Sequence, residues 1–172
     1  MAEWVAADGR FVVQLPSAVL SHLHEHCGRG HPDETGGVLT GRYEADHRVA
    51  HVTAASAPPT DSRSGRTWFV RGIVGLADRF ARVWGRSPRA YYLGEWHYHP
   101  SSDVRPSGRD RKQMRAIARD PRYHCPEPLL IIVGSAAAGH PLHAEVVLAS
   151  GKIVRLSNGG PPYSPGQALG TG

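Results

Sequence analysis

The sequence contains little cysteine and no long hydrophobic run. Two cysteines, Cys27 and Cys125, are too few for a disulfide-built scaffold, and we expect both to be free thiols. The longest apolar run, residues 129–133, has the length of a strand, whereas a membrane-spanning helix needs about 20 apolar residues. Residues 1–10 hold acidic side chains and no apolar stretch of signal length. These absences predict a cytoplasmic protein that does not enter a membrane.

Charge of one sign is not concentrated in any segment. The formal net charge is +5, from 20 Lys and Arg against 15 Asp and Glu. The arginines are scattered, and no zinc-finger spacing or RNA-binding aromatic motif accompanies them, so we expect no nucleic-acid partner. A chain of 172 residues fits one domain. We place this domain at residues 1–157 and a flexible Gly/Pro-rich tail at residues 158–172.

Apolar periodicity and turn residues predict interleaved helices and strands. Helices are expected over residues 17–27, 72–84 and 107–119. Strands are expected over residues 11–15, 36–43, 49–55, 68–70, 91–99, 129–135, 144–149 and 153–156. Residues 58–66 lack apolar periodicity and are expected to form an exposed loop, a candidate flap over a site. This order predicts an α/β (α+β) fold with a mixed sheet.

The strand expected at residues 91–99 carries two histidines on one face. Side chains alternate along a strand, so His97 and His99 point the same way, while Trp96 and Tyr98 point the opposite way. Two imidazoles placed in this manner can bind one metal ion. Glu95 shares their parity, so it is expected on the metal side, either supporting the site or forming a surface ion pair.

A carboxylate follows at the start of the next expected helix. Ser107 occupies the N-cap position, and Asp110 lies in the first turn, where the helix N-terminus favours a negative charge. Taken alone, this pair is better explained as an ordinary capping box. The return from strand to helix can also bring Asp110 beside His97 and His99. Two histidines and one carboxylate are a common catalytic zinc set, which leaves a fourth position open for water.

Hydrolysis at such a centre needs a proton acceptor, and the candidate is Glu34. It stands in the segment Asp33-Glu34-Thr35-Gly36-Gly37, directly before an expected strand, where the glycines allow close backbone approach. It would act first as general base and then as general acid. For an isolated glutamate, an ordinary loop position is the better explanation, and only the other motif residues favour a catalytic role.

Together these residues resemble the JAB/MPN/Mov34 metallopeptidases that carry a JAMM motif. That motif is an upstream glutamate, then His-x-His-Pro, then Ser-x-x-Asp, with ten residues between the second histidine and the aspartate. Glu34, the segment His97-Tyr98-His99-Pro100, Ser107 and Asp110 fill every polar position at this spacing. The resemblance covers residues 10–156 in the order of elements.

The resemblance implies an α-β-α sandwich around a curved mixed β-sheet. It implies Zn²⁺ held by His97, His99 and Asp110, with Glu34 acting on the attacking water and Ser107 stabilising the oxyanion. It therefore implies a zinc metallopeptidase, of the isopeptidase type.

One departure from the family pattern narrows the resemblance. Many eukaryotic members have Ser or Thr between the two histidines, whereas this chain has Tyr98, which argues against a eukaryotic-style deubiquitinase. The segment around the histidines is more similar to bacterial deconjugases of type II CBASS or ubiquitin-like conjugation antiphage operons. A ubiquitin-like or otherwise conjugated protein, made by an E1/E2-like system, is the implied substrate. Two alternatives stay open: a non-catalytic MPN-like interaction scaffold, and a peptidase that trims a sulfur-carrier-like protein.

Several further candidates carry less weight. The run of histidines at residues 22–26 fails the zincin pattern, because Gly28 stands where the second histidine is needed. A second zinc site would have to use residues without any paired-cysteine motif, namely Cys27, His31, His124 and Cys125. Aromatic residues expected in the core are Trp68, Phe69, Phe80, Trp84 and Trp96. Candidate contacts for acidic groups of a substrate are Arg63, Arg66 and Arg105.

Overall fold

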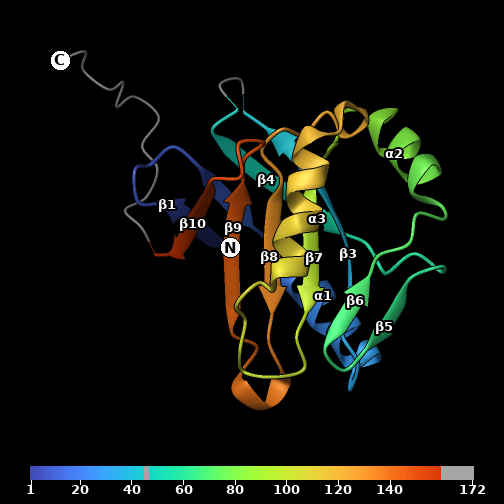
Figure 1. The fold of residues 1–172 in the computed structure, drawn as a ribbon. Helices are drawn as coiled ribbons and strands as arrows, with labels where there is room; N and C mark the ends of the chain where they lie inside the picture. The colour runs from blue at the N-terminus through green and yellow to red at the C-terminus, as the bar shows by residue number, and fades with distance from the viewer. Residues whose placement is uncertain (45–46, 160–172) are drawn as a thin grey trace.

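The computed structural model describes residues 1–44 and 47–159 (Figure 1). The strands are β1 (Ala2–Ala6), β2 (Val12–Leu15), β3 (Thr35–Tyr43), β4 (Val49–Ala55), β5 (Arg63–Gly65), β6 (Trp68–Val70), β7 (Tyr91–Tyr98), β8 (Leu129–Val133), β9 (Leu142–Val147) and β10 (Ile153–Asn158). The helices are α1 (Ser17–Gly30), α2 (Leu76–Trp84) and α3 (Gly108–Arg119). No helix in these two ranges is long and apolar enough to cross a membrane.

One mixed sheet organises the molecule. Its hydrogen-bonded strands follow the order β1-β10-β9-β8-β7-β3-β4-β2, and β2 also pairs with β1, so the sheet closes on itself. The β2–β4 and β7–β8 pairs are parallel, and the other pairs are antiparallel. Strand β8 is buried along its whole length. Its five consecutive apolar residues are typical of a strand that is covered on both faces. The predicted mixed α/β architecture is therefore confirmed.

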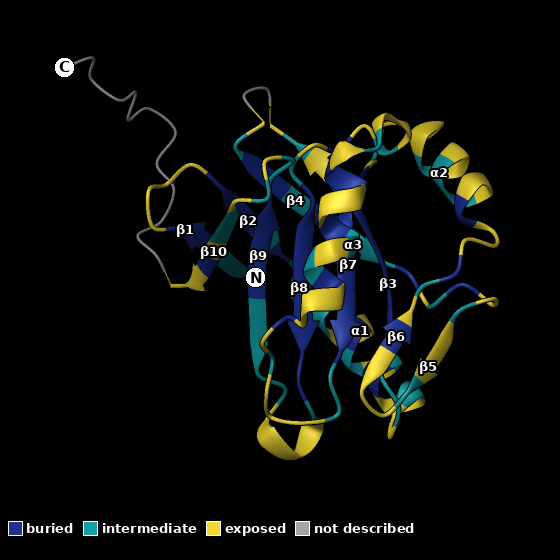
Figure 2. Cartoon of the chain, viewed as in Figure 1, coloured by how far each residue is buried: buried dark blue, intermediate teal, exposed yellow. Residues whose placement is uncertain are grey.

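The helices pack on two separate groups of core side chains. On α1, Val19, Leu23 and Cys27 recur every four residues, so they share one face and join the larger core cluster. On α3, Met114 and Ile117 belong to a second cluster, formed with the other face of β8. Figure 2 shows the strands largely buried and the outer face of α3 exposed. The central strands therefore lie between α1 and α3.

Two strands differ from the sequence prediction. β1 forms because it pairs with β2 on one side and β10 on the other, and contacts so distant in sequence leave no local pattern. β5 occupies the end of the segment 58–66, so the prediction of a loop throughout that segment is wrong. It pairs with β6 in a two-stranded hairpin. Asn158, placed in the predicted tail, belongs to β10, and residues 160–172 of that tail lie outside the described residues.

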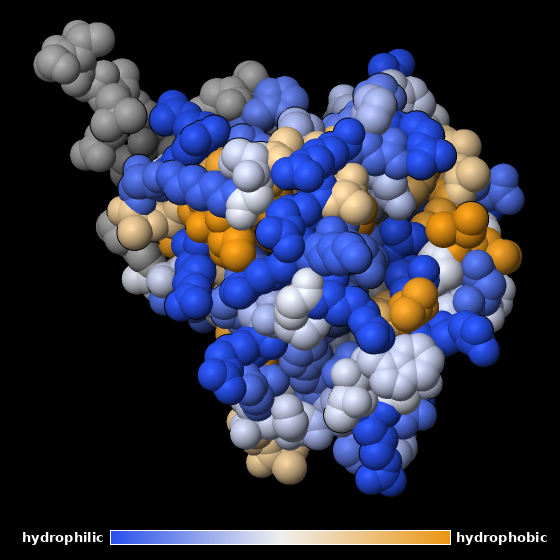
Figure 3. Space-filling view, viewed as in Figure 1, coloured by the Kyte–Doolittle hydropathy of each residue, from blue (hydrophilic) through white to orange (hydrophobic). Residues whose placement is uncertain are grey.

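Helix α2 begins at Leu76, later than the predicted residue 72. The Asp61 carboxylate accepts hydrogen bonds from the backbone nitrogens of Ile73 and Val74, at 3.0 and 2.9 Å, and holds this stretch in a turn. Ile73 and Val74 are consequently 70% and 57% exposed. Figure 3 shows that one face of the molecule is mainly hydrophilic, with small apolar patches between the hydrophilic residues.

The predicted core placement of the aromatic residues is partly correct. Trp96 and Phe69 are buried, as predicted, and Phe80 packs partly buried against the second cluster. The prediction is wrong for Trp68 and Trp84, which are 38% and 51% exposed. Trp68 belongs to β6 and Trp84 ends α2, and both elements lie at the edge of the fold (Figure 1).

Candidate functional site

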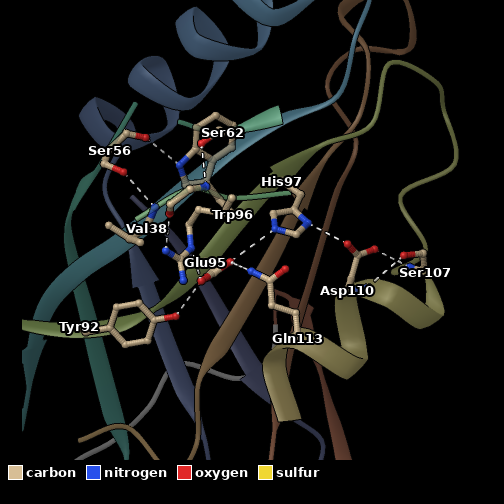
Figure 4. Close-up of polar contacts among 12 residues, drawn as sticks. Val38, Ser56, Ser62, Tyr92, Glu95, Trp96, His97, Ser107, Asp110 and Gln113 are labelled. Carbon is tan, nitrogen blue, oxygen red and sulfur yellow. Dashed lines mark hydrogen bonds and ion pairs between the residues drawn. The ribbon is translucent and has the colours of Figure 1, made fainter. Parts of the chain in front are cut away.

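The two motif histidines lie at the carboxyl end of β7. His97 is in the strand and 1% exposed, and His99 follows the last strand residue. Trp96 and Tyr98 point to the opposite face, into the larger core cluster, as strand alternation requires. Figure 4 shows the His97 ring directed toward the start of α3.

The start of α3 supplies the carboxylate beside His97. The Ser107 hydroxyl accepts a hydrogen bond from the Asp110 backbone nitrogen at 3.2 Å, and the Ser107 backbone nitrogen donates to Asp110 Oδ2 at 2.6 Å. This is a complete capping box. Asp110 Oδ1 lies 2.9 Å from Nδ1 of His97. Burial opposes ionisation of Asp110, but the bonds from His97 and Ser107 prevail and lower its pKa to about 2. The same carboxylate therefore caps the helix and binds the histidine.

His97 and His99 have different electrostatic surroundings. Burial disfavours a charged His97, but the carboxylates of Asp110 and Glu95 outweigh it and raise the His97 pKa to about 9. For His99, burial dominates and lowers the pKa, so this ring is neutral near pH 7. His99 Nδ1 lies 3.1 Å from the carbonyl oxygen of Asp103, and its Nε2 lies 3.9 Å from Asp110 Oδ2.

Glu34 lies at the same site, in the position directly before β3. Thr35 pairs with Tyr98 in the antiparallel β3–β7 ladder. Because the two strands run in opposite directions, Glu34, just before Thr35, lies across from His99, just after Tyr98. Both side chains line a cavity of about 230 Å³. Burial raises the pKa of Glu34 to about 7, and the nearby Asp110 charge adds to this effect, while His97 and Arg109 oppose it. Glu34 can therefore hold or release a proton near neutral pH.

The five residues of the predicted motif thus lie around one end of β7. Within residues 1–44 and 47–159, no group of three or more His, Cys, Asp or Glu side chains is positioned to hold a metal ion. His97 and His99 instead direct their Nδ1 atoms to oxygens of Asp110 and Asp103.

The donor chemistry of these residues nevertheless fits a metal. Two imidazoles and a carboxylate are drawn together, with Asp110 2.9 Å from Nδ1 of His97 and 3.9 Å from Nε2 of His99. A cation shared by these three side chains would balance the Asp110 charge, because a buried carboxylate is costly without a counter-charge.

Three residues near His97 were not identified as a network by sequence reasoning. Glu95 was predicted on the metal side, and its Oε2 does face Nε2 of His97 at 3.6 Å. Arg71 and Gln113 both bond to Glu95, and no spacing signal marks them because they come from other segments. Phe69, predicted only as a core residue, packs against His97 in a T-shaped arrangement, with 5.4 Å between ring centroids.

The remaining sequence candidates lie apart from the motif or at its rim. Arg66 and Arg105 line the cavity with Glu34, whereas Arg63 is exposed on β5 and does not. Cys27 and Cys125 are free thiols, as predicted, and the structure places both in the interior. Neither contributes to a metal-binding cluster in the described part of the chain.

Comparison with curated proteins finds relatives along most of the chain. It is 36% identical over 147 residues to "CD-NTase/cGAS isopeptidase" of Enterobacter hormaechei subsp. hoffmannii, covering 85% of this chain and 81% of that protein. It is 30% identical over 154 residues to a protein of the same name from Pseudomonas aeruginosa, with coverages of 88% and 93%. It is 31% identical over 130 residues to "Probable metalloprotease y4qB" of Sinorhizobium fredii, with coverages of 71% and 75%.

A solved structure and a family model also match most of the chain. The solution structure of protein DSY2949 from Desulfitobacterium hafniense superposes with a TM-score of 0.59 at 20% identity, covering 83% of this chain and 88% of that one, which shows a shared fold. A family model described as prokaryotic homologs of the JAB domain matches residues 16–146. The chain therefore belongs to the prokaryotic JAB-domain family.

Proposed function

We propose that this protein is a zinc-dependent isopeptidase or peptidase. It would hydrolyse the amide bond after the C-terminus of a ubiquitin-like or otherwise conjugated protein. The observation that carries the proposal is the meeting of His97, His99 and Asp110 at one end of β7, with Glu34 in the same cavity as His99. Relatives named isopeptidase and metalloprotease support a hydrolase.

His97, His99 and Asp110 would hold the zinc ion. A bound Zn²⁺ would polarise the scissile carbonyl and lower the pKa of a water molecule. Ligands bind in their deprotonated forms, which suits His99, whose pKa is lowered, and Asp110, whose pKa is about 2. His97 is protonated near pH 7 in this arrangement, so metal binding would release its proton.

Glu34 and Ser107 would handle the proton and the developing negative charge. Glu34 takes a proton from the attacking water and gives it to the departing amine. A pKa of about 7 suits both steps near neutral pH. The exposed Ser107 hydroxyl accepts a bond from the Asp110 backbone and keeps its own proton, which it can donate to the oxyanion of the tetrahedral intermediate.

The proposed substrate and setting follow the bacterial relatives. The name "CD-NTase/cGAS isopeptidase" supports a conjugated CD-NTase-like protein as substrate. The proposal adds an E1/E2-like system that makes this conjugate and an antiphage role in the cytoplasm, both of which the resemblance around the histidines implies. The proposal includes the α-β-α sandwich expected for the family. Helices on two separate core clusters support that layering.

The test is hydrolysis of a purified conjugate that joins a CD-NTase C-terminus to a lysine side chain, followed by mass spectrometry. Glu34→Gln should lower kcat by about 100-fold or more, because it removes the general base while leaving the proposed metal ligands intact. Glu25→Gln is the matched control, since Glu25 is an exposed glutamate on α1 paired with Arg29. Undiminished hydrolysis by Glu34→Gln would overturn the proposed mechanism. Zinc binding with no hydrolysis by the wild type would favour the scaffold alternative.

A further inference from the structure

We propose that Glu95 is a positioning residue that fixes the His97 imidazole for the metal. It acts through a buried network with Arg71 and Gln113. This inference rests on the proposed function, because it assigns His97 to the metal. It adds a residue that lies outside the JAMM pattern.

Glu95 lies directly behind His97. It precedes the histidine by two positions on β7, shares its face of the sheet, and has 0% exposure. Its Oε2 is 3.6 Å from Nε2 of His97, while Nδ1 on the other side of the ring meets Asp110 at 2.9 Å. The imidazole is therefore placed between two carboxylates (Figure 4). When Nδ1 and Asp110 both bind the metal, the Glu95 carboxylate facing Nε2 favours a hydrogen on that nitrogen, which also sets the ring orientation.

The partners of Glu95 leave its carboxylate little freedom to turn. Arg71 Nε donates to Oε1 at 2.6 Å, Gln113 Nε2 donates to Oε2 at 2.6 Å, and Tyr92 Oη donates to Oε1 at 3.3 Å. The Arg71 side chain is only 4% exposed and also donates to the Gly72 carbonyl at 2.8 Å. A buried carboxylate that accepts three hydrogen bonds has a fixed orientation. Oε2 is therefore held toward His97.

The same network joins the segments that carry the site. Arg71 directly follows β6, the strand in which Phe69 packs against the His97 ring. The hairpin partner β5 contains Gly65, whose carbonyl oxygen accepts a hydrogen bond from the Glu34 backbone nitrogen at 2.9 Å. Gln113 lies one turn after Asp110 on α3. Glu95 thus links the β5–β6 hairpin and α3 to β7 through its hydrogen bonds with Arg71 and Gln113. Removing its charge should therefore weaken metal binding more than removing an equally buried charge elsewhere.

A second buried glutamate provides the matched control. Glu145 on β9 also has 0% exposure, and it accepts two hydrogen bonds from Arg111 at 3.1 Å and one from His143 at 2.9 Å. None of these contacts involves a proposed metal ligand. Glu145→Gln therefore reproduces the loss of a buried charge without touching His97.

The experiment measures the Zn²⁺ dissociation constant by competition with a chelating indicator, alongside thermal unfolding of each metal-free variant. Glu95→Gln should raise the Kd for Zn²⁺ by about 10- to 100-fold, the range for losing a residue that supports a metal ligand. Glu145→Gln should leave this Kd unchanged. Imidazole ¹H–¹⁵N NMR spectra of the zinc-loaded proteins should show that the hydrogen position on His97 changes in Glu95→Gln and stays as in the wild type in Glu145→Gln.

The possible results separate this inference from the proposed function. One result is that the wild type binds zinc, His97→Ala does not, and Glu95→Gln and Glu145→Gln have equal Kd values for Zn²⁺. This result would overturn the role of Glu95 and leave the proposed function standing. Absence of zinc binding in the folded wild type would overturn both. If Glu95→Gln does not fold, Gln113→Leu removes one donor from Oε2 and keeps the charge. A smaller rise in Kd is then expected, and an unchanged Kd would refute the inference.

Discussion

A single methyl group added at Gly36 should damage both stability and the proposed metal site. Gly36 on β3 stands directly across from His97 on β7. A Cβ built at this position would come closest to the carbonyl oxygen of Trp96. It would also stand 2.8 Å from His97 Cδ2 and 2.8 Å from Phe69 Cε1. A backbone carbonyl of a central strand cannot move aside without weakening the sheet, so Gly36→Ala must displace the His97 ring, the Phe69 ring or both strands.

The size of the effect follows from overpacking of a filled interior. Extra carbon atoms in a well-packed core typically cost about 1–3 kcal/mol. For a domain of this length, each kcal/mol lowers Tm by about 2–4 °C, so a decrease of about 2–12 °C is expected. Because His97 is among the displaced groups, affinity for zinc should fall as well.

Urea unfolding, thermal unfolding and zinc titration of Gly36→Ala test this reasoning. The matched control is Gly28→Ala on α1, where a new Cβ would meet no atom within 4 Å. That variant should be stabilised by about 0.5–1 kcal/mol, because alanine restricts the unfolded chain and favours helix. If Gly36→Ala matches the wild type in both stability and zinc affinity, the packing around His97 is not as described.

Three further predictions concern the core and its charges. Leu23→Ala should lower the free energy of unfolding by about 2–5 kcal/mol in urea titrations, because Leu23 is 0% exposed in the larger core cluster. Arg111→Ala should lower it by about 3 kcal/mol at pH 7, since it breaks the ion pair with the buried Glu145. His143 and Arg111 outweigh burial and lower the Glu145 pKa, so this contribution is present above the ordinary glutamate value of 4.5. It should disappear as the pH falls through the folded-state pKa, and urea titrations from pH 7 to pH 3 measure this. Burial raises the thiol pKa of Cys27 to about 12 and of Cys125 to about 11, so neither should react with iodoacetamide at pH 8 until the protein is unfolded.

Features encoded by neighbouring residues were predictable from the sequence. The alternation of a strand placed His97 and His99 on one face and Trp96 on the other. Helix-capping chemistry placed Ser107 at the start of α3. These predictions succeed because residues only a few positions apart determine them.

Features that depend on distant contacts were not predictable. β1 exists because it pairs with β10 from the other end of the chain. The β5–β6 hairpin begins within a segment that has no apolar alternation, and its Arg71 meets Glu95 only after the chain has folded. The exposure of Trp84 likewise depends on which layers cover α2, and no local pattern reports this. Sequence reasoning therefore found the motif but not the network beneath it.

Metal content tests the central claim most directly. Wild-type protein and His97→Ala, both purified without added metal, would be compared by elemental mass spectrometry, with circular dichroism to verify folding. We predict about one zinc ion per wild-type chain and its loss in His97→Ala. A folded wild type that contains no zinc, or a His97→Ala variant that retains it, would contradict the proposed metal centre.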